Sequence, residues 1–260
     1  SRAGAAGFDE LPLTEVDLAC FTQLSYLPYA AAFETMDRPS LREAGDALAG
    51  VEADKVYNIF LRKRLELMRA MMEAPRYAGI ILSDYIREID PQSEKQFCAL
   101  TLTLPFGERV ISFEGTDSTL VGWKEDFNMS FVSPVPSQEA ARAYLHRIAA
   151  GCGEAPLILT GHSKGGNLAV WSAAFAREDV QRRVLGVHSF DGPGLIDQDA
   201  DSAGYARISG RIHAYLPQNS LVGVLMRRHV PSIVVKSHAF SVMQHDLFTW
   251  EVEPEGHAFV

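Results

Sequence analysis

The sequence has 260 residues, of which 47% are hydrophobic, 10% aromatic and 22% charged; this composition suffices for the core of one large domain and excludes disordered, collagen-like and low-complexity proteins. Acidic side chains (33) outnumber basic ones (24), and the formal net charge of −9 argues against a nucleic-acid partner. Three widely spaced cysteines, and no apolar run long enough to span a membrane, predict a cytoplasmic protein without a disulfide framework or a metal site.

The first third of the chain carries helix signals. Two hydroxyl residues each precede an acidic residue by three positions, which is the spacing of helix N-caps. Apolar residues then repeat every three or four positions over 56–72, predicting a third helix that ends before Pro75. Its methionines are expected in the core, not in a cofactor site. We therefore predict a helical N-terminal extension over residues 1–75. The N-cap pairs are Thr14 with Asp17 and Ser40 with Glu43.

Beyond residue 96 the apolar pattern changes to a period of two, and then short apolar strands alternate with helical stretches. Strands separated by helices are typical of a mostly parallel sheet with right-handed crossovers. The predicted fold class is therefore α/β, with a central sheet flanked by helices, in one domain of residues 1–260. The predicted segments are a hairpin (97–104 and 109–113), strands 157–159, 184–188, 212–216 and 233–236, and helices 166–176 and 221–228.

A Gly-x-Ser-x-Gly motif, formed by Gly161, Ser163 and Gly165, lies between an apolar strand and an alanine-rich helix. In that context the pattern indicates a nucleophile elbow, a strained turn that exposes the serine above the sheet. Glycines are needed because a Cβ two residues on either side would collide with a neighbouring strand or the helix. The N–H of Lys164, at the helix N-terminus, can donate to an oxyanion. Its side chain is expected on the surface.

A serine hydroxyl needs a base to become a good nucleophile. Of the eight histidines, His162 lies inside the elbow and is expected to point away from Ser163, into packing or a hydrogen bond at the sheet edge. In this kind of fold the base follows the last crossover strand, and both His238 and His245 satisfy that condition. His188 and His229 are the other histidines considered.

The acidic partner of the histidine is less clear, because residues 202–245 contain no Asp or Glu. Asp191 follows the strand before that stretch, at the sheet edge where open α/β folds bind ligands. It is the favoured acid, although Asp before Gly also forms simple turns. The alternatives are three aspartates in a polar segment expected to be mobile, or an amide or hydroxyl group. These alternatives are Asp197, Asp199 and Asp201, and then Asn219 and Ser220.

A second oxyanion donor is expected after the strand 109–113, where the chain continues with Glu114, Gly115 and Thr116. Gly115 allows the backbone to approach closely, and Thr116 offers its N–H and its hydroxyl. The carboxylate of Asp126 can orient that hydroxyl.

These segments resemble the class 3, or fungal-type, lipase branch of the α/β hydrolases, and more closely a bacterial family of unknown function. The resemblance covers about residues 10–252 and implies an α/β-hydrolase fold, with Ser163 as nucleophile, His245 as base, and Thr116 with Lys164 as oxyanion hole. Departures from the lipase pattern are Glu114 in place of Arg, Gly122 in place of an acid, and no carboxylate at the lipase acid position. The segments are Phe-Glu-Gly-Thr, Trp123 with Asp126, Gly-His-Ser-Lys-Gly-Gly-Asn-Leu-Ala, Asp191-Gly-Pro-Gly, Ser220-Leu-Val-Gly, Val235-Lys-Ser and Gln244-His-Asp.

The leading hypothesis is a serine hydrolase that cleaves a carboxylic ester or thioester, with a small acyl ester or lipid-like molecule as substrate and no cofactor. A catalytically degenerate hydrolase that serves as a binding or scaffold module is the alternative, and acyl transfer to another acceptor a third. The apolar segment 120–135 either forms a lid over an acyl chain or packs on the core, and the predicted helix from residue 221 has the same two interpretations.

Overall fold

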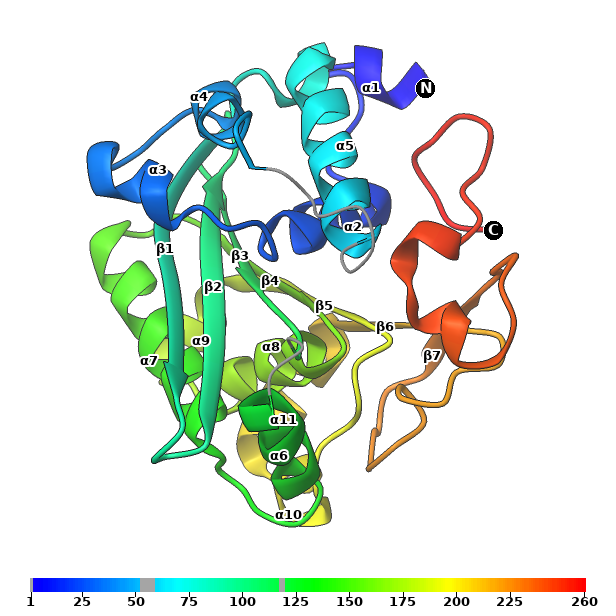
Figure 1. Ribbon diagram of the computed structural model, residues 1–260. Helices are drawn as coiled ribbons and strands as arrows, with labels where there is room; N and C mark the ends of the chain where they lie inside the picture. Colours follow the sequence, from blue (N-terminus) through cyan, green and yellow to red (C-terminus); the bar gives the residue numbers. More distant parts are fainter. Residues whose placement is uncertain (1, 52–58, 117–119) are drawn as a thin grey trace.

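A seven-stranded sheet forms the centre of the molecule, of which the computed structural model describes residues 2–51, 59–116 and 120–260. Its strands lie side by side in chain order (Figure 1). The first two pairs are antiparallel and the remaining four are parallel. The predicted α/β class and mostly parallel sheet are therefore confirmed. The strands are β1 (Ile81–Asp90), β2 (Lys95–Thr103), β3 (Arg109–Phe113), β4 (Leu157–His162), β5 (Val184–Phe190), β6 (Ile212–Pro217) and β7 (Ser232–Val235).

Helices cover both faces of the sheet. The first five precede it in the chain, and four short 3-10 turns (η1–η4) complete the elements. The α-helices are α1 (Arg2–Ala5), α2 (Glu15–Leu24), α3 (Ala30–Thr35), α4 (Leu41–Ala47), α5 (Ile59–Glu73), α6 (Leu120–Met129), α7 (Pro136–Gly151), α8 (Lys164–Ala174), α9 (Glu178–Arg183), α10 (Asp197–Ala200) and α11 (Ala203–Ile208). The 3-10 turns are η1 (Pro75–Tyr77), η2 (Ser209–Arg211), η3 (Ser241–His245) and η4 (Leu247–Thr249).

The core is divided by the sheet into two apolar layers. One layer packs α7, α8 and α11 against the sheet. The other packs α2, α4 and α5 together with residues near the C-terminus, such as Trp250, against the opposite face. Figure 1 shows the N-terminal helices in blue and cyan on one side, with α7 and α8 on the other. Since each strand alternates its side chains between two faces, both layers draw on the same strands.

The N-terminal helices begin where the caps predict. Thr14 and Ser40 each accept the N–H of the acidic residue three positions on, whose carboxylate accepts the cap N–H in return. Such a cap stabilises a helix by about 1 kcal/mol. Arg76 links the segments around α2, because its buried guanidinium forms an ion pair with Asp17 at 2.6 Å and donates to the Leu11 carbonyl. The predicted third helix is α5; the part of the prediction before Ile59 lies outside the described residues.

Two of the differences from the predictions concern strand β1 and the segment 221–228. Strand β1 was not predicted, and a register shift between Ser83 and Ile86 breaks the alternation that would have revealed it. The predicted helix 221–228 is wrong. Instead, the backbone of this segment pairs with the loop after β5, where Leu195 and Arg227 each donate their N–H to the other's carbonyl oxygen. Met226 has a left-handed φ of 65°, which a helix does not allow.

Candidate active site

Ser163 lies at the sharp turn between β4 and α8. Its backbone has φ 58° and ψ −129°, a conformation that L residues rarely adopt, and its N–H donates to the Phe190 carbonyl of β5 at 3.0 Å. Close packing explains both flanking glycines. A Cβ on Gly161 would come within 2.1 Å of the Gly165 carbonyl oxygen, and one on Gly165 within 2.2 Å of the Phe113 carbonyl oxygen. The geometry is that of a strand–elbow–helix turn.

His245, at the end of η3, forms a hydrogen bond with Asp191, which directly follows β5. Its Nδ1 lies 2.7 Å from Oδ2 of Asp191. The aspartate is only 1% exposed, and its other oxygen accepts the Ser220 hydroxyl and, at 3.1 Å, the N–H of Gly223. Three donors thus hold this carboxylate, two from the loop after β6 and one from η3. An ionised Asp191 accepts, so Nδ1 of His245 carries the proton and Nε2 is left as the basic nitrogen.

The other proposed acids lie elsewhere. Asp199 is buried in α10 and accepts hydrogen bonds from Trp171 and Ser133, so the expectation that this segment is a mobile loop is wrong. Asp201 pairs with His229 at 2.8 Å in an exposed second histidine–aspartate pair. Ser220 bonds to Asp191, and the Asn219 N–H donates to the side chain of Gln244. The remaining acid, Asp197, lies near Arg227, and His238 is exposed.

The loop after β3 lies against the elbow. A Cβ on Gly115 would come within 2.6 Å of the His162 carbonyl oxygen and 3.2 Å of the Ser163 Cβ, so only glycine allows this approach. The next residue, Thr116, donates its hydroxyl to Asp126 of α6. Burial raises the pKa of Asp126 above its ordinary value, although Lys164 and the Thr116 hydroxyl act in the opposite direction. The structure therefore brings the predicted pair Thr116 and Asp126 together beside the serine.

The side chain of Lys164 does not lie on the surface, which corrects the expectation from sequence. It is 2% exposed, and its ammonium donates to the Gln96 carbonyl at 2.7 Å and to the Glu125 carboxylate at 3.1 Å. Glu125 is equally buried and also accepts the N–H groups of Gln96 and Ser137. A buried charge requires this degree of pairing. Meanwhile the N–H of Lys164, at the start of α8, has no intrahelical acceptor.

His162 forms two hydrogen bonds and lies beside His245. Its Nε2 lies 2.7 Å from the His245 carbonyl oxygen and its Nδ1 3.2 Å from the Tyr26 hydroxyl. The two imidazole rings are 4.4 Å apart. Burial, followed by repulsion from His245, holds the pKa of His162 well below its ordinary value. Tyr26 was missed from sequence, because a tyrosine after a helix carries no signal of a partner 136 positions away.

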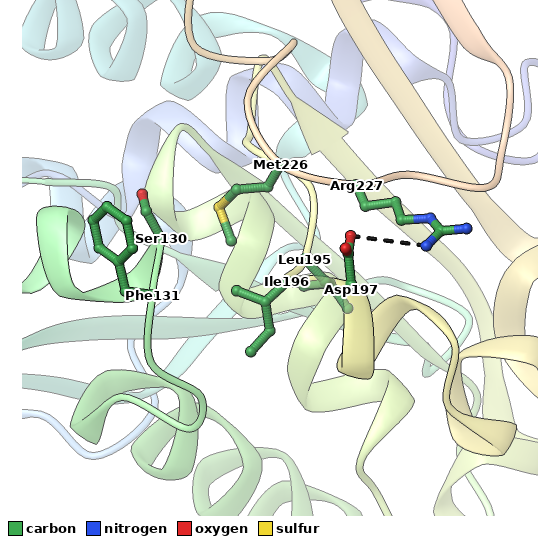
Figure 2. A pocket seen from close by; sticks show the side chains of 7 residues that line it. All are labelled: Ser130, Phe131, Leu195, Ile196, Asp197, Met226 and Arg227. Carbon is green, nitrogen blue, oxygen red and sulfur yellow. Dashed lines mark ion pairs between the residues drawn. The ribbon is translucent and has the colours of Figure 1, made fainter.

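A cavity of about 580 Å³ opens between the end of α6 and the loops after β5 and β6 (Figure 2). Its apolar side chains come from all three segments. In Figure 2, Phe131 lies on the left, and the Asp197–Arg227 ion pair lies on the right. Each segment also contributes to the site, since Asp126, Asp191 and Gly223 lie only three or four positions before the first cavity residue of their segments. The lining residues are Ser130, Phe131, Leu195, Ile196, Asp197, Met226 and Arg227.

Comparisons with known proteins found one matching family model and similar solved structures. A family model described as Mbeg1-like matches residues 71–260. Among solved structures, a fungal lipase–inhibitor complex, reported as a model for interfacial activation in lipases, is similar over 80% of this chain and 73% of that one, at 15% identity and a TM-score of 0.47. None of the curated proteins matches this chain. Across the residues that the structure describes, no helix has the length and apolar character of a bilayer span.

Proposed function

The chain belongs to the Mbeg1-like family, and we propose that it is a serine hydrolase that cleaves a carboxylic ester or thioester through an acyl-enzyme on Ser163. The observation that carries this proposal is the His245–Asp191 hydrogen bond of 2.7 Å beside the elbow. It joins a base and its orienting acid at the carboxyl edge of the sheet, where the elbow exposes its serine. It also weakens the scaffold hypothesis, which rested on the missing carboxylate after residue 201.

In the proposed reaction, Nε2 of His245 takes the Ser163 proton as Oγ attacks the substrate carbonyl carbon. The N–H groups of Lys164 and Thr116 donate hydrogen bonds to the carbonyl oxygen and stabilise the negative charge that develops on it. His245 then returns the proton to the leaving alcohol or thiol. A water molecule, activated by the same histidine, releases the acid and regenerates Ser163. Throughout, Asp191 holds the imidazole in the tautomer with Nδ1 protonated.

We propose that the cavity, whose three lining segments each follow a residue of the site in the chain, takes the acyl chain of the substrate. Part of its lining is apolar and comes from three segments, including Phe131, Leu195 and Met226, and that part suits a hydrocarbon chain. The remaining lining is polar and includes the Asp197–Arg227 ion pair. This placement makes the substrate a lipid-like or medium-chain ester. A panel of p-nitrophenyl esters of increasing acyl length measures both activity and the depth of the pocket.

Labelling with a fluorophosphonate probe tests the proposal directly. We expect the purified protein to form a covalent adduct at Ser163, because a serine beside an oxyanion hole traps the tetrahedral phosphonyl group. Peptide mass spectrometry identifies the modified residue, and Ser163→Ala is the matched control. Protein that is never labelled, or that is still labelled after Ser163→Ala, favours the binding-module alternative.

Asp126 tests the oxyanion side of the site. Its carboxylate accepts the Thr116 hydroxyl, and the neutral amide oxygen of Asp126→Asn is a weaker acceptor, so this variant should hold that hydroxyl less firmly in its present orientation. Because the oxyanion exists mainly in the transition state, we expect kcat to fall by about tenfold or more with little change in KM. Steady-state kinetics on one ester measure both constants. A loss confined to KM would instead give this residue a role in substrate contact.

A further inference from the structure

We infer that Tyr26 is a positioning residue of this site, because its hydroxyl joins the oxyanion loop to the base through a chain of hydrogen bonds that runs in one direction. The inference rests on the proposed function and adds to it a residue from the N-terminal segment. Tyr26 lies just after α2, outside the residues 71–260 that match the family model.

The direction of the chain follows from counting protons. The N–H of Gly115 donates to the Tyr26 hydroxyl oxygen at 2.9 Å. Burial holds the pKa of His162 well below its ordinary value, so the ring is neutral and carries one proton. A carbonyl oxygen can only accept, so the proton is on Nε2, which faces the His245 carbonyl, and the unprotonated Nδ1 accepts the Tyr26 hydroxyl at 3.2 Å. The Nε2–H group donates to the His245 carbonyl oxygen at 2.7 Å.

The chain connects three parts of the site that are far apart in sequence. Gly115, which precedes Thr116, lies so close to the elbow that a Cβ on it would come within 3.2 Å of the Ser163 Cβ. His162 directly precedes the serine, and His245 is the proposed base. Because the N–H of Gly115 donates to Tyr26, the position of Gly115 is fixed and its N–H is not available to an oxyanion. The N–H of the next residue, Thr116, is the donor that we assign to the oxyanion. Tyr26 thus sets the position of the oxyanion loop relative to the base.

The tyrosine ring is itself fixed by the N-terminal helices. The guanidinium of Arg64, from α5, lies 3.8 Å from the ring centroid, and its Nε donates to the Gln23 side chain of α2 at 2.9 Å. A cation over a ring face attracts the ring electrostatically. The N-terminal helices therefore hold the hydroxyl where the chain needs it, and an account of the site restricted to residues 71–260 would omit it.

The test compares Tyr26→Phe with Tyr29→Phe. Both variants lose one hydroxyl from the same segment, but the buried Tyr29 hydroxyl has no hydrogen-bond partner among the residues described here. We expect Tyr26→Phe to lower kcat about tenfold, with KM and the thermal midpoint close to wild type, and Tyr29→Phe to leave kcat unchanged. The affinity for a trifluoromethyl ketone, which forms a tetrahedral adduct, should fall in parallel with kcat. Equal kinetics in the two variants would overturn the inference.

Nuclear magnetic resonance of ¹⁵N-labelled histidine gives a second readout that does not depend on activity. We expect His162 in the wild type to be neutral with its proton on Nε2, and Tyr26→Phe to shift it towards a mixture of tautomers. A proton on Nδ1 in the wild type would overturn the direction of the chain. A wild type that hydrolyses no ester would contradict the proposed function, and the tautomer measurement would still decide whether the chain exists.

Discussion

If the proposed function holds, replacing His245 with alanine is expected to lower kcat for ester hydrolysis by on the order of 10⁶-fold, as loss of the base does in serine proteases. In the structure this imidazole is the one held by Asp191, at 2.7 Å, and its ring centroid lies 4.4 Å from that of His162 in the elbow. Without it, no group removes the proton of Ser163. Fluorophosphonate labelling and the acylation burst with a p-nitrophenyl ester should both disappear.

The matched control for this experiment is His238→Ala. His238 is exposed, and its backbone N–H donates to the Thr249 carbonyl, so its side chain should matter neither for acylation nor for folding. The His245 variant should also keep a thermal midpoint near that of wild type, because Asp191 retains Ser220 and Gly223 as donors. Full activity in His245→Ala would move the base to His238 or to His229.

Replacing Asp191 with asparagine is expected to cost at least two orders of magnitude in kcat, and on the order of 10⁴ if the imidazole turns fully to the wrong tautomer. An asparagine amide that keeps the Ser220 and Gly223 hydrogen bonds with its oxygen presents N–H to the histidine. Nδ1 of His245 must then accept, which places the proton on Nε2, the nitrogen that should receive the Ser163 proton. The measurement is kcat on the ester with the best acyl chain, together with the pH profile.

Asp199→Asn is the control for this second substitution. Asp199 is also a buried carboxylate that accepts two side-chain hydrogen bonds, from Trp171 and Ser133, but it has no histidine partner. Its replacement should change kcat almost not at all, even if stability falls. If the two variants lose activity equally, burial of a carboxylate and not orientation of the histidine would explain the effect of Asp191.

Much of the fold could be predicted because its signals are local. The capping pairs at Thr14 and Ser40, the period-two hairpin and the strand before the elbow each depend on residues within one turn or one strand. The elbow glycines follow from the same logic, because the collisions they avoid arise between adjacent elements. The prediction of a helix over 221–228 was wrong because the backbone of Arg227 forms hydrogen bonds with Leu195, which is 32 positions earlier in the chain.

The sequence favoured Asp191 as the acid but left several alternatives open. Asp191, Asp199 and Asp201 lie within eleven positions of one another, and each follows or enters a turn. Only the pairing of β5 with β6 and the path of the chain after β7 bring one of them to His245. The hydroxyl of Ser220, another proposed partner of the histidine, is used instead to hold this acid.

By itself, the sequence determined the α/β class, the elbow serine and the two segments expected to flank it, since these follow from periodicity, caps and a motif in its structural context. Tertiary structure alone decided three matters: that Asp191 faces His245, that Lys164 pairs with Glu125 inside the protein, and that Tyr26 reaches the oxyanion loop. The physical reason is shared. Hydrogen bonds and buried charge pairs act over about 3 Å, whereas the residues that make these contacts are 39 to 89 positions apart in the chain. No local sequence pattern predicts which of these distant segments the folded sheet brings together.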